Sequence, residues 1–196
     1  MNVDKSIHKP QMYITPEKAA DTVMHHLSAD SRLIVTGQIG CGKTTLARKI
    51  CSLLTLTHLE IDDFCDDPDP LVSAAEAART LKGGWVAEAN VWQIPPTIWE
   101  ASDFVIFLDY ANWIHYIGII RRCIRRCLRA KTWVNVQHSV KEEFSHLKIV
   151  YLYANENRRT WQKQGGITSS TTAVIRCTSR YETRRLFAQL STNIQK

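Results

Sequence analysis

A short apolar strand, a glycine-rich turn and the start of a helix follow one another over residues 32–45. The spacing G-x-x-x-x-G-K-[ST] is matched there by Gly37, Gly42, Lys43 and Thr44. Glycines allow the backbone to turn with positive φ and to approach a ligand closely. The exposed amide groups then form a concave anion site, to which the following helix adds its partial positive charge. The segment therefore predicts a nucleoside-triphosphate-binding loop at the start of a mixed strand–helix fold.

The loop residues have distinct expected roles. We expect Lys43 to reach the β- and γ-phosphates and the Thr44 hydroxyl to bind Mg²⁺. No Asn-Lys-x-Asp segment, which would read guanine, follows on the later strands, so ATP with Mg²⁺ is the expected ligand and a GTP switch is disfavoured. The expected nucleotide contacts are Gly37, Gln38, Ile39, Gly40, Cys41, Gly42, Lys43, Thr44 and Thr45.

Composition limits the partners. The net charge of +6 and the pI near 9.1 favour anionic ligands, which include both nucleotide phosphates and nucleic acid. The polar start of the chain and the lack of a run of about 20 apolar residues predict a cytoplasmic protein without a membrane partner. The six cysteines lack zinc-site spacing and are expected to be reduced thiols, and the seven histidines show no ligand spacing either.

Apolar runs alternate with helical segments along the chain. Continuous apolar strands indicate a parallel sheet that is covered by helices on both faces. The strands are predicted at 32–36, 58–61, 85–89, 104–108 and 173–177, and the helices at 15–27, 46–54, 71–81, 112–129, 140–161 and 179–190. Residues 94–101 are predicted to form a short helix or a turn. Residues 149–153 favour a strand by propensity, but no turn residue interrupts the segment, and a helix is preferred. We expect an N-terminal helical extension, residues 1–30, and a single domain, residues 31–196.

Acidic residues stand at the carboxyl ends of three predicted strands: Asp62 with Asp63, Glu88, and Asp109. Ligands of such sheets bind at this edge. Glu88 is the first candidate for an acid that holds Mg²⁺ through water beside Thr44, and Asp109 is the second. The alternative for Glu88 is a solvent-exposed charge at a strand end.

Four blocks of the chain together resemble adenylate-kinase-like P-loop proteins, and within them the group usually labelled DNA topology modulation proteins. The resemblance covers roughly residues 32–190 and implies a five-stranded parallel sheet in the order 2-3-1-4-5, ATP with Mg²⁺, and phosphoryl transfer to a small acceptor. One departure is Glu88-Ala-Asn-Val91, where the family usually has Asp-Gly-Asn-Tyr. The blocks are residues 37–45, 59–63, 85–90, and 107–110 with 121–126.

The resemblance also implies roles for residues outside the glycine-rich loop. Asp62 matches a carboxylate that orients the acceptor hydroxyl or accepts its proton, although an Asp pair can equally cap a loop. The helix with five arginines resembles the one that leads into the lid of such enzymes. Arg122 and Arg126 are the first candidates for stabilising the moving phosphoryl group, with Arg121 and Arg125 close behind. A solvated basic helix face is the simpler reading.

Two functions remain open from the sequence. The first is a kinase that acts on a nucleoside, a nucleotide or another small hydroxyl compound. The second is a nucleic-acid-associated ATP-binding protein, in which the arginine helix grips the phosphate backbone and Trp133 stacks on a base. The sequence does not name the acceptor.

Overall fold

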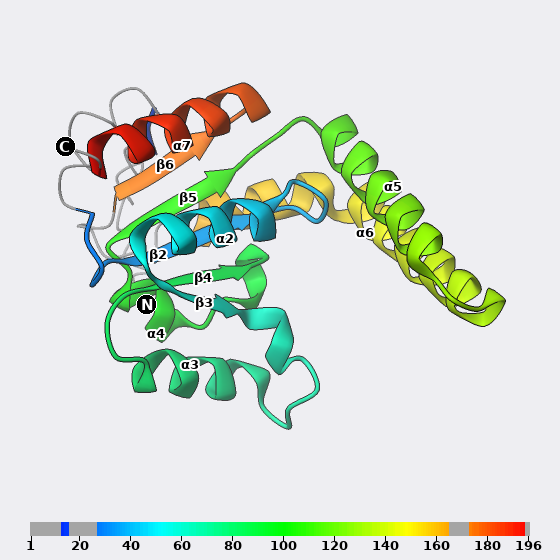
Figure 1. Ribbon diagram of the computed structural model, residues 1–196, viewed down its shortest axis with the longest axis horizontal. Helices are drawn as coiled ribbons and strands as arrows, with labels where there is room; N and C mark the ends of the chain where they lie inside the picture. Colours follow the sequence, from blue (N-terminus) through cyan, green and yellow to red (C-terminus); the bar gives the residue numbers. More distant parts are fainter. Residues whose placement is uncertain (1–12, 16–26, 165–172, 195–196) are drawn as a thin grey trace, which may run out of the picture.

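The computed structural model describes residues 13–15, 27–164 and 173–194 (Figure 1). Its centre is a six-stranded parallel sheet in the order β1-β6-β5-β2-β4-β3. The strands are β1 (Tyr13–Ile14), β2 (Arg32–Gly37), β3 (Thr57–Glu60), β4 (Trp85–Ala89), β5 (Phe104–Leu108) and β6 (Ala173–Cys177).

Without the two-residue β1, the sheet has the order 2-3-1-4-5 counted along the chain, which confirms the predicted topology. The sequence did not predict β1, which extends the sheet beside β6. Residues 16–26, which hold most of the expected N-terminal helix, lie outside the described residues. The division into an extension, 1–30, and a domain, 31–196, therefore stays a prediction.

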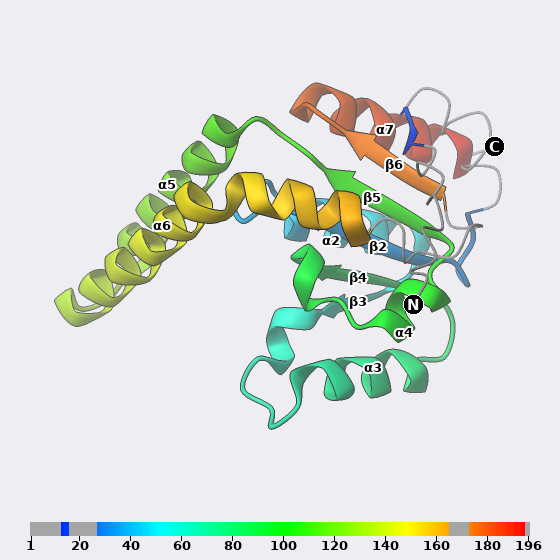
Figure 2. The same ribbon diagram turned by 180° about the vertical axis from the view of Figure 1, so that it is seen from behind.

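Helices cover both faces of the sheet. One apolar cluster joins α2 and α7 to the sheet, and a second joins α3 and α4 to the opposite face, where α6 also passes (Figure 2). The helices are α2 (Lys43–Leu54), α3 (Pro70–Thr80), α4 (Pro96–Ala101), α5 (Asn112–Arg129), α6 (Trp133–Gln164) and α7 (Arg180–Ile194), with short 3₁₀ turns η2 (Ile61–Phe64) and η3 (Val91–Gln93). Within the described ranges no helix has the length and apolar character needed to cross a membrane.

Helix α6 confirms the prediction that residues 149–153 are helical rather than a strand. The helix begins at Trp133, whereas the sequence predicted a start at residue 140. The segment with strand propensity is helical, and its Val150 is buried in a small cluster with Ile119 of α5. Packing against α5 therefore outweighs the local preference. Together, α5 and α6 form a helical hairpin that projects beyond the carboxyl edge of the sheet (Figure 1).

The strands bring the expected site residues to one edge. Every residue of β4 is buried, and β4 lies between β2 and β3. The register pairs Thr36 with Ala89, and Glu60 with Glu88. Because all strands run parallel, the glycine-rich loop, η2 and η3 follow their carboxyl ends at the same edge.

Candidate active site

The glycine-rich loop joins β2 to α2 and is pressed against α5. Gly40 and Gly42 have φ values of +82° and +100°, the left-handed region that favours glycine. A Cβ on Gly40 would lie 2.5 Å from the carbonyl oxygen of His115, and a Cβ on Gly118 of α5 would overlap the carbonyl oxygen of Gly40. The sequence analysis did not single out Gly118. The close approach of α5 to the loop requires glycine at both Gly40 and Gly118.

The loop opens onto a cavity of about 1400 Å³ at the carboxyl edge of the sheet. No side chain caps the first turn of α2, so its amide groups stay available to an anion. Cys41 is buried within the loop, and burial raises the pKa of its thiol, which favours a neutral thiol there. The cavity is lined by the loop from Ile39 to Leu46 and by residues of β3, β4, η2, η3, α5, α6 and α7. This arrangement fits the phosphate chain of a nucleotide.

Two polar contacts hold the start of α2 against the end of β4 and the residue that follows it. Lys43 is only 8% exposed, and its Nζ donates a hydrogen bond to Asn90 Oδ1 at 3.2 Å. The Thr44 hydroxyl donates to Glu88 Oε1 at 2.8 Å. Burial raises the pKa of the Glu88 carboxyl, and the nearby Lys43 ammonium opposes this effect. Mg²⁺ prefers oxygen ligands such as hydroxyl and carboxylate groups. Thr44 and Glu88 therefore fit the expected Mg²⁺ ion.

A chain of hydrogen bonds connects Lys43 to Asp62. Asn90 accepts from Lys43 and donates through Nδ2 to Gln93 Oε1. Gln93 Nε2 then donates to Asp62 Oδ1 at 2.7 Å. Each donor points the same way, from the ammonium group towards the carboxylate. The structure thus brings Asp62 into the same site as the glycine-rich loop.

Gln93 is a site residue that the sequence analysis missed. Asn90 and Gln93 form a capping box around η3, in which each side chain bonds the backbone of the other end. The N-x-x-Q spacing was the available signal, because such a box begins with a capping residue and has Glu or Gln three positions later. Val91 is buried and does not line the cavity. Its neighbour Trp92, which is 41% exposed, does line it.

The arginines of α5 fall into two groups. Arg122 makes a two-pronged contact with Glu143 of α6, at 2.6 and 2.7 Å. Arg126 holds Glu142 in the same way, at 2.9 and 2.7 Å, and also reaches Glu143. Burial acts to raise the pKa of Glu143, but hydrogen bonds from Arg122 and Arg126 outweigh it and lower that pKa.

These contacts tie Arg122 and Arg126 to α6, so the expected role of the two at the moving phosphoryl group stays a prediction. Arg121 and Arg125 are exposed and line the cavity, which Arg122 lines as well. Among the described residues, neither side chain has an ion pair or hydrogen bond. The second candidate acid, Asp109, accepts a hydrogen bond from Arg176 Nε of β6 at 2.9 Å, so a neighbouring strand already occupies its carboxylate.

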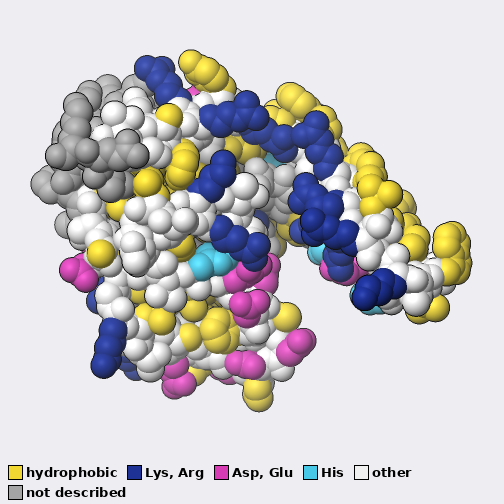
Figure 3. Space-filling view, in the orientation of Figure 1, with side chains coloured by type: hydrophobic (Ala, Val, Ile, Leu, Met, Phe, Trp, Pro, Cys, Tyr) yellow, Lys and Arg dark blue, Asp and Glu magenta, His cyan; other side chains and the backbone are white. Residues whose placement is uncertain are grey.

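The two sides of the cavity carry opposite charge (Figure 3). The basic side is formed by α2, α5 and α7, and its cavity-lining side chains include Arg48, Lys49, Arg121, Arg125, Arg180 and Arg184. The acidic side is formed by the end of β3 and by η2, where Glu60 and Asp62 line the cavity. The exposed Asp63, Asp66 and Asp67 follow close by in the chain. The described arrangement therefore offers one side to phosphates and another to a group that is not anionic.

Comparison with known proteins finds similarity to solved structures alone. No protein-family model matches the chain, and no curated protein matches it. A shikimate kinase from Acinetobacter baumannii, solved with shikimate, is 13% identical with a TM-score of 0.47, over 84% of this chain and 93% of that one. A shikimate kinase from Bacteroides thetaiotaomicron is 11% identical with a TM-score of 0.42, over 85% and 99%.

A third structure, from Chloroflexus aurantiacus and described only provisionally as a kinase, is 14% identical with a TM-score of 0.44, over 84% and 98% of the two chains. The function of the present chain is therefore argued from its own residues.

Proposed function

We propose that this protein is an Mg-ATP-dependent phosphotransferase that acts on a small hydroxyl acceptor. The observation that carries the proposal is the hydrogen-bond chain from Lys43 to Asp62, next to the contact between Thr44 and Glu88. A phosphate-binding lysine, an oxygen donor set for Mg²⁺ and an exposed carboxylate thus meet at one cavity. Phosphoryl transfer depends mainly on such positioning and charge stabilisation.

The residues around the phosphates have separate roles in this proposal. The loop amides and Lys43 bind the β- and γ-phosphates. The Thr44 hydroxyl, and Glu88 through water, would hold Mg²⁺, which supplies charge neutralisation when bound. Arg121 and Arg125, which face the cavity, bind the oxygens of the transferred group through their guanidinium forks. Arg122 and Arg126 position this helix by holding α6.

Asp62 acts on the acceptor. Gln93 holds its Oδ1, which leaves Oδ2 to accept a hydrogen bond from the acceptor hydroxyl and to take its proton during transfer. Because Asp62 is exposed and lines the cavity, an acceptor can reach it without displacing a core residue.

The acceptor is a neutral or cationic hydroxyl compound. The side of the cavity that bears Asp62 also carries Glu60 and the exposed Trp92. Carboxylates repel an anionic acceptor, and an aromatic face stacks on a flat ring or attracts a cationic amine. A nucleoside or a hydroxylated amine therefore fits this side better than a nucleoside monophosphate.

The test is ADP release from Mg-ATP with three groups of acceptors: nucleosides, nucleoside monophosphates and hydroxylated amines. Wild-type protein is compared with Lys43→Ala and Asp62→Asn. The proposal expects turnover with a neutral or cationic acceptor, a fall of at least about tenfold in Asp62→Asn, and ATP binding that only Lys43→Ala loses. No acceptor-dependent turnover with any group, despite ATP binding, contradicts it.

One observation favours the second candidate function, nucleic-acid binding. Trp133 is 72% exposed at the tip of the α5–α6 hairpin, close in sequence to the exposed Arg129 and Lys131. Exposed cations beside an aromatic ring are typical of surfaces that bind single strands. A labelled oligonucleotide titrated at rising salt tests it, because affinity from phosphate contacts falls steeply with salt. Absence of binding at low salt removes this candidate.

A further inference from the structure

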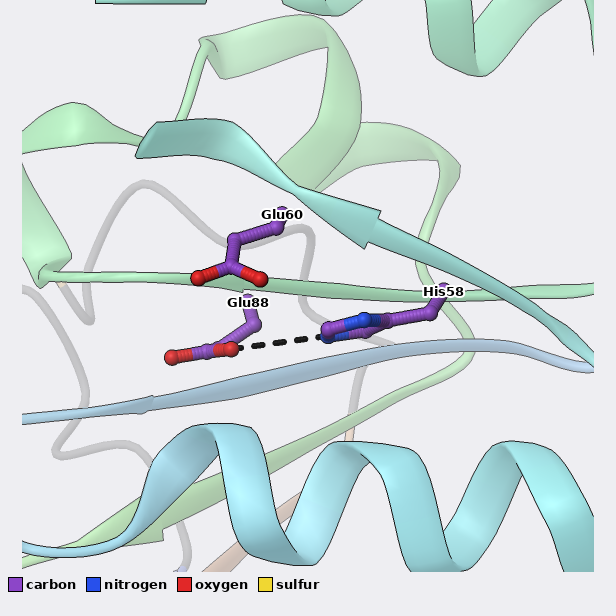
Figure 4. Close-up of side chains that lie close together, drawn as sticks. All are labelled: His58, Glu60 and Glu88. Carbon is purple, nitrogen blue, oxygen red and sulfur yellow. Dashed lines mark ion pairs between the residues drawn. The ribbon is translucent and has the colours of Figure 1, made fainter. Parts of the chain in front are cut away.

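Three potential metal ligands meet on the face of the sheet beneath α2, where the sequence showed no ligand spacing (Figure 4). His58 and Glu60 are two positions apart on β3, so their side chains share a face. Glu88 of β4 is the register partner of Glu60. One ligand atom from each of the three side chains lies within 4.8 Å of the other two.

Two buried atoms of the cluster, Glu88 Oε2 and His58 Nε2, have no hydrogen-bond partner within the described residues. Glu88 is only 4% exposed, and within the described residues its Oε2 has no hydrogen-bond partner. This oxygen points at His58 Nε2, 3.4 Å away, an atom that is also buried without a hydrogen bond among those residues. Like charges placed directly opposite on adjacent strands repel. Two cations of α2 act on the cluster: the Lys43 ammonium lies near Glu88, and Arg48 approaches Glu60 at 3.4 Å. The Arg48 side chain is 67% exposed, so its charge is largely screened.

The spacing suits a small divalent metal ion. Metal–ligand bonds of about 2.0–2.2 Å in a tetrahedral site separate neighbouring ligand atoms by about 3.3–3.6 Å. The distance of 3.4 Å between His58 Nε2 and Glu88 Oε2 falls within this range. Mg²⁺ prefers oxygen ligands alone, whereas an imidazole with carboxylates favours Zn²⁺ and similar transition metals. Since Glu60 and Glu88 also line the cavity, an ion has a route to them.

We propose that His58, Glu60 and Glu88 form a transition-metal site, with Zn²⁺ as its best-fitting ion and a solvent molecule in the fourth position. Glu88 Oε1 faces Thr44 while Oε2 faces His58, so one carboxylate belongs to both this site and the proposed Mg²⁺ site. Zn²⁺ on Oε2 draws charge from that carboxylate and places a second dication nearby. Zn²⁺ therefore weakens Mg²⁺ binding, an effect that rests on the proposed function.

The binding half of the proposal is tested without nucleotide. Zn²⁺ is titrated calorimetrically into the chain, and Co²⁺ is followed by its visible absorption, in wild-type protein, His58→Gln and Glu60→Gln. The proposal expects one equivalent bound by wild type and an affinity at least about 10- to 100-fold weaker in His58→Gln, since removing even a supporting partner of a ligand has that effect. Glu60→Gln gives a second reading if the histidine variant does not fold.

His138→Gln is the matched control. His138 lies near Glu142 on the exposed surface of α6, with 3.9 Å between Nδ1 and Oε2, so it is a histidine–carboxylate pair outside the cluster. Its replacement is expected to leave Zn²⁺ affinity unchanged. Undetectable Zn²⁺ binding by wild type, or equal affinity in wild type and His58→Gln, overturns the proposal.

The second half of the proposal, that Zn²⁺ weakens Mg²⁺ binding, is tested by measuring turnover. The Mg²⁺ concentration for half-maximal rate is determined with and without Zn²⁺, at one fixed ATP concentration, in wild type and His58→Gln. The same chelation of Zn²⁺ by ATP applies to both proteins and cancels in the comparison. If Zn²⁺ raises the Mg²⁺ concentration for half-maximal rate in wild type but not in His58→Gln, the result supports the proposed effect of Zn²⁺ on Mg²⁺ binding. An equal rise in both proteins overturns it. If no acceptor supports turnover, the proposed function fails while the calorimetric result still decides the metal site.

Discussion

Gln93 Nε2 donates a hydrogen bond to Asp62 Oδ1 at 2.7 Å, and so joins η3 to η2 across the end of the sheet. The two residues are 31 positions apart in the chain. On the other side, Gln93 accepts from Asn90, which in turn holds the ammonium group of Lys43. A single amide side chain therefore fixes the orientation of the proposed acceptor-binding carboxylate relative to Lys43 of the glycine-rich loop.

Replacing Gln93 with Ala is expected to reduce kcat about tenfold while leaving the affinity for ATP nearly unchanged. The variant frees Asp62 to rotate but removes no group that touches the nucleotide, and a misaligned base loses only part of its effect. Steady-state kinetics and ATP titration measure the two quantities. Gln137→Ala, at an exposed position of α6, is the matched control. A fall in ATP affinity equal to the fall in kcat would contradict the positioning role.

Thr44 is expected to tolerate Ser but not Val. Serine keeps a hydroxyl that can donate to Glu88, whereas valine keeps the shape and leaves the buried carboxylate without that donor. We expect Thr44→Val to raise the Mg²⁺ concentration for half-maximal turnover at least about tenfold, and Thr44→Ser to change it little. Turnover is measured over a Mg²⁺ series. Equal behaviour of the two variants would exclude the hydroxyl as a ligand.

Arg121 and Arg125 are expected to affect catalysis, and Arg122 and Arg126 to affect stability. Arg125→Gln removes a cavity-facing charge and should lower kcat by about 10²-fold, as losing one donor to a transition-state oxyanion does. Arg122→Gln takes away the main partner of Glu143, which is 1% exposed, and should lower the free energy of unfolding by about 1–3 kcal/mol. Kinetics and urea unfolding separate the two effects. If Arg122→Gln instead lowered kcat and Arg125→Gln lowered stability, the catalytic role would belong to Arg122, which also lines the cavity.

Gly118→Ala is expected to destabilise the protein and impair nucleotide binding, although alanine is the better helix former by about 1 kcal/mol. Its Cβ would overlap the carbonyl oxygen of Gly40, so α5 must move away from the glycine-rich loop. Urea unfolding and ATP titration measure the result. Stabilisation by about the helix-propensity difference, with ATP affinity intact, would show that the contact between α5 and the loop is dispensable.

The contribution of Glu143 to stability is expected to disappear in acid. Its pKa is lowered in the folded chain, so the stabilisation is present above the ordinary glutamate pKa and is lost as pH falls through the lowered value. The difference in unfolding free energy between wild type and Glu143→Gln should therefore be largest near neutral pH and shrink below about pH 4.5. Urea unfolding over a pH series measures this difference. A difference that grows as the pH falls would contradict the prediction.

Local patterns in the sequence predicted most of the fold. The predicted strands at 85–89, 104–108 and 173–177 and the helix at 112–129 have the observed bounds. Continuous apolar runs and capping residues encode such elements over a few neighbouring positions, and Ser179 does accept a bond from the Glu182 amide as a cap. The two-residue β1 was missed because it is held by contacts with distant segments, through its pairing with β6 and the packing of Ile14 against the core.

The sequence by itself determined the glycine-rich loop, with its expected role in phosphate binding, because the glycines, Lys43 and Thr44 act through local backbone geometry and one adjoining helix. Only the tertiary structure decided which distant side chains meet that loop. Glu142 and Glu143 of α6 separate Arg122 and Arg126 from Arg121 and Arg125, and the strand register brings Glu60 to Glu88 with His58 beside them. These contacts join segments far apart in the chain, and no local periodicity records which partner a charged side chain will find.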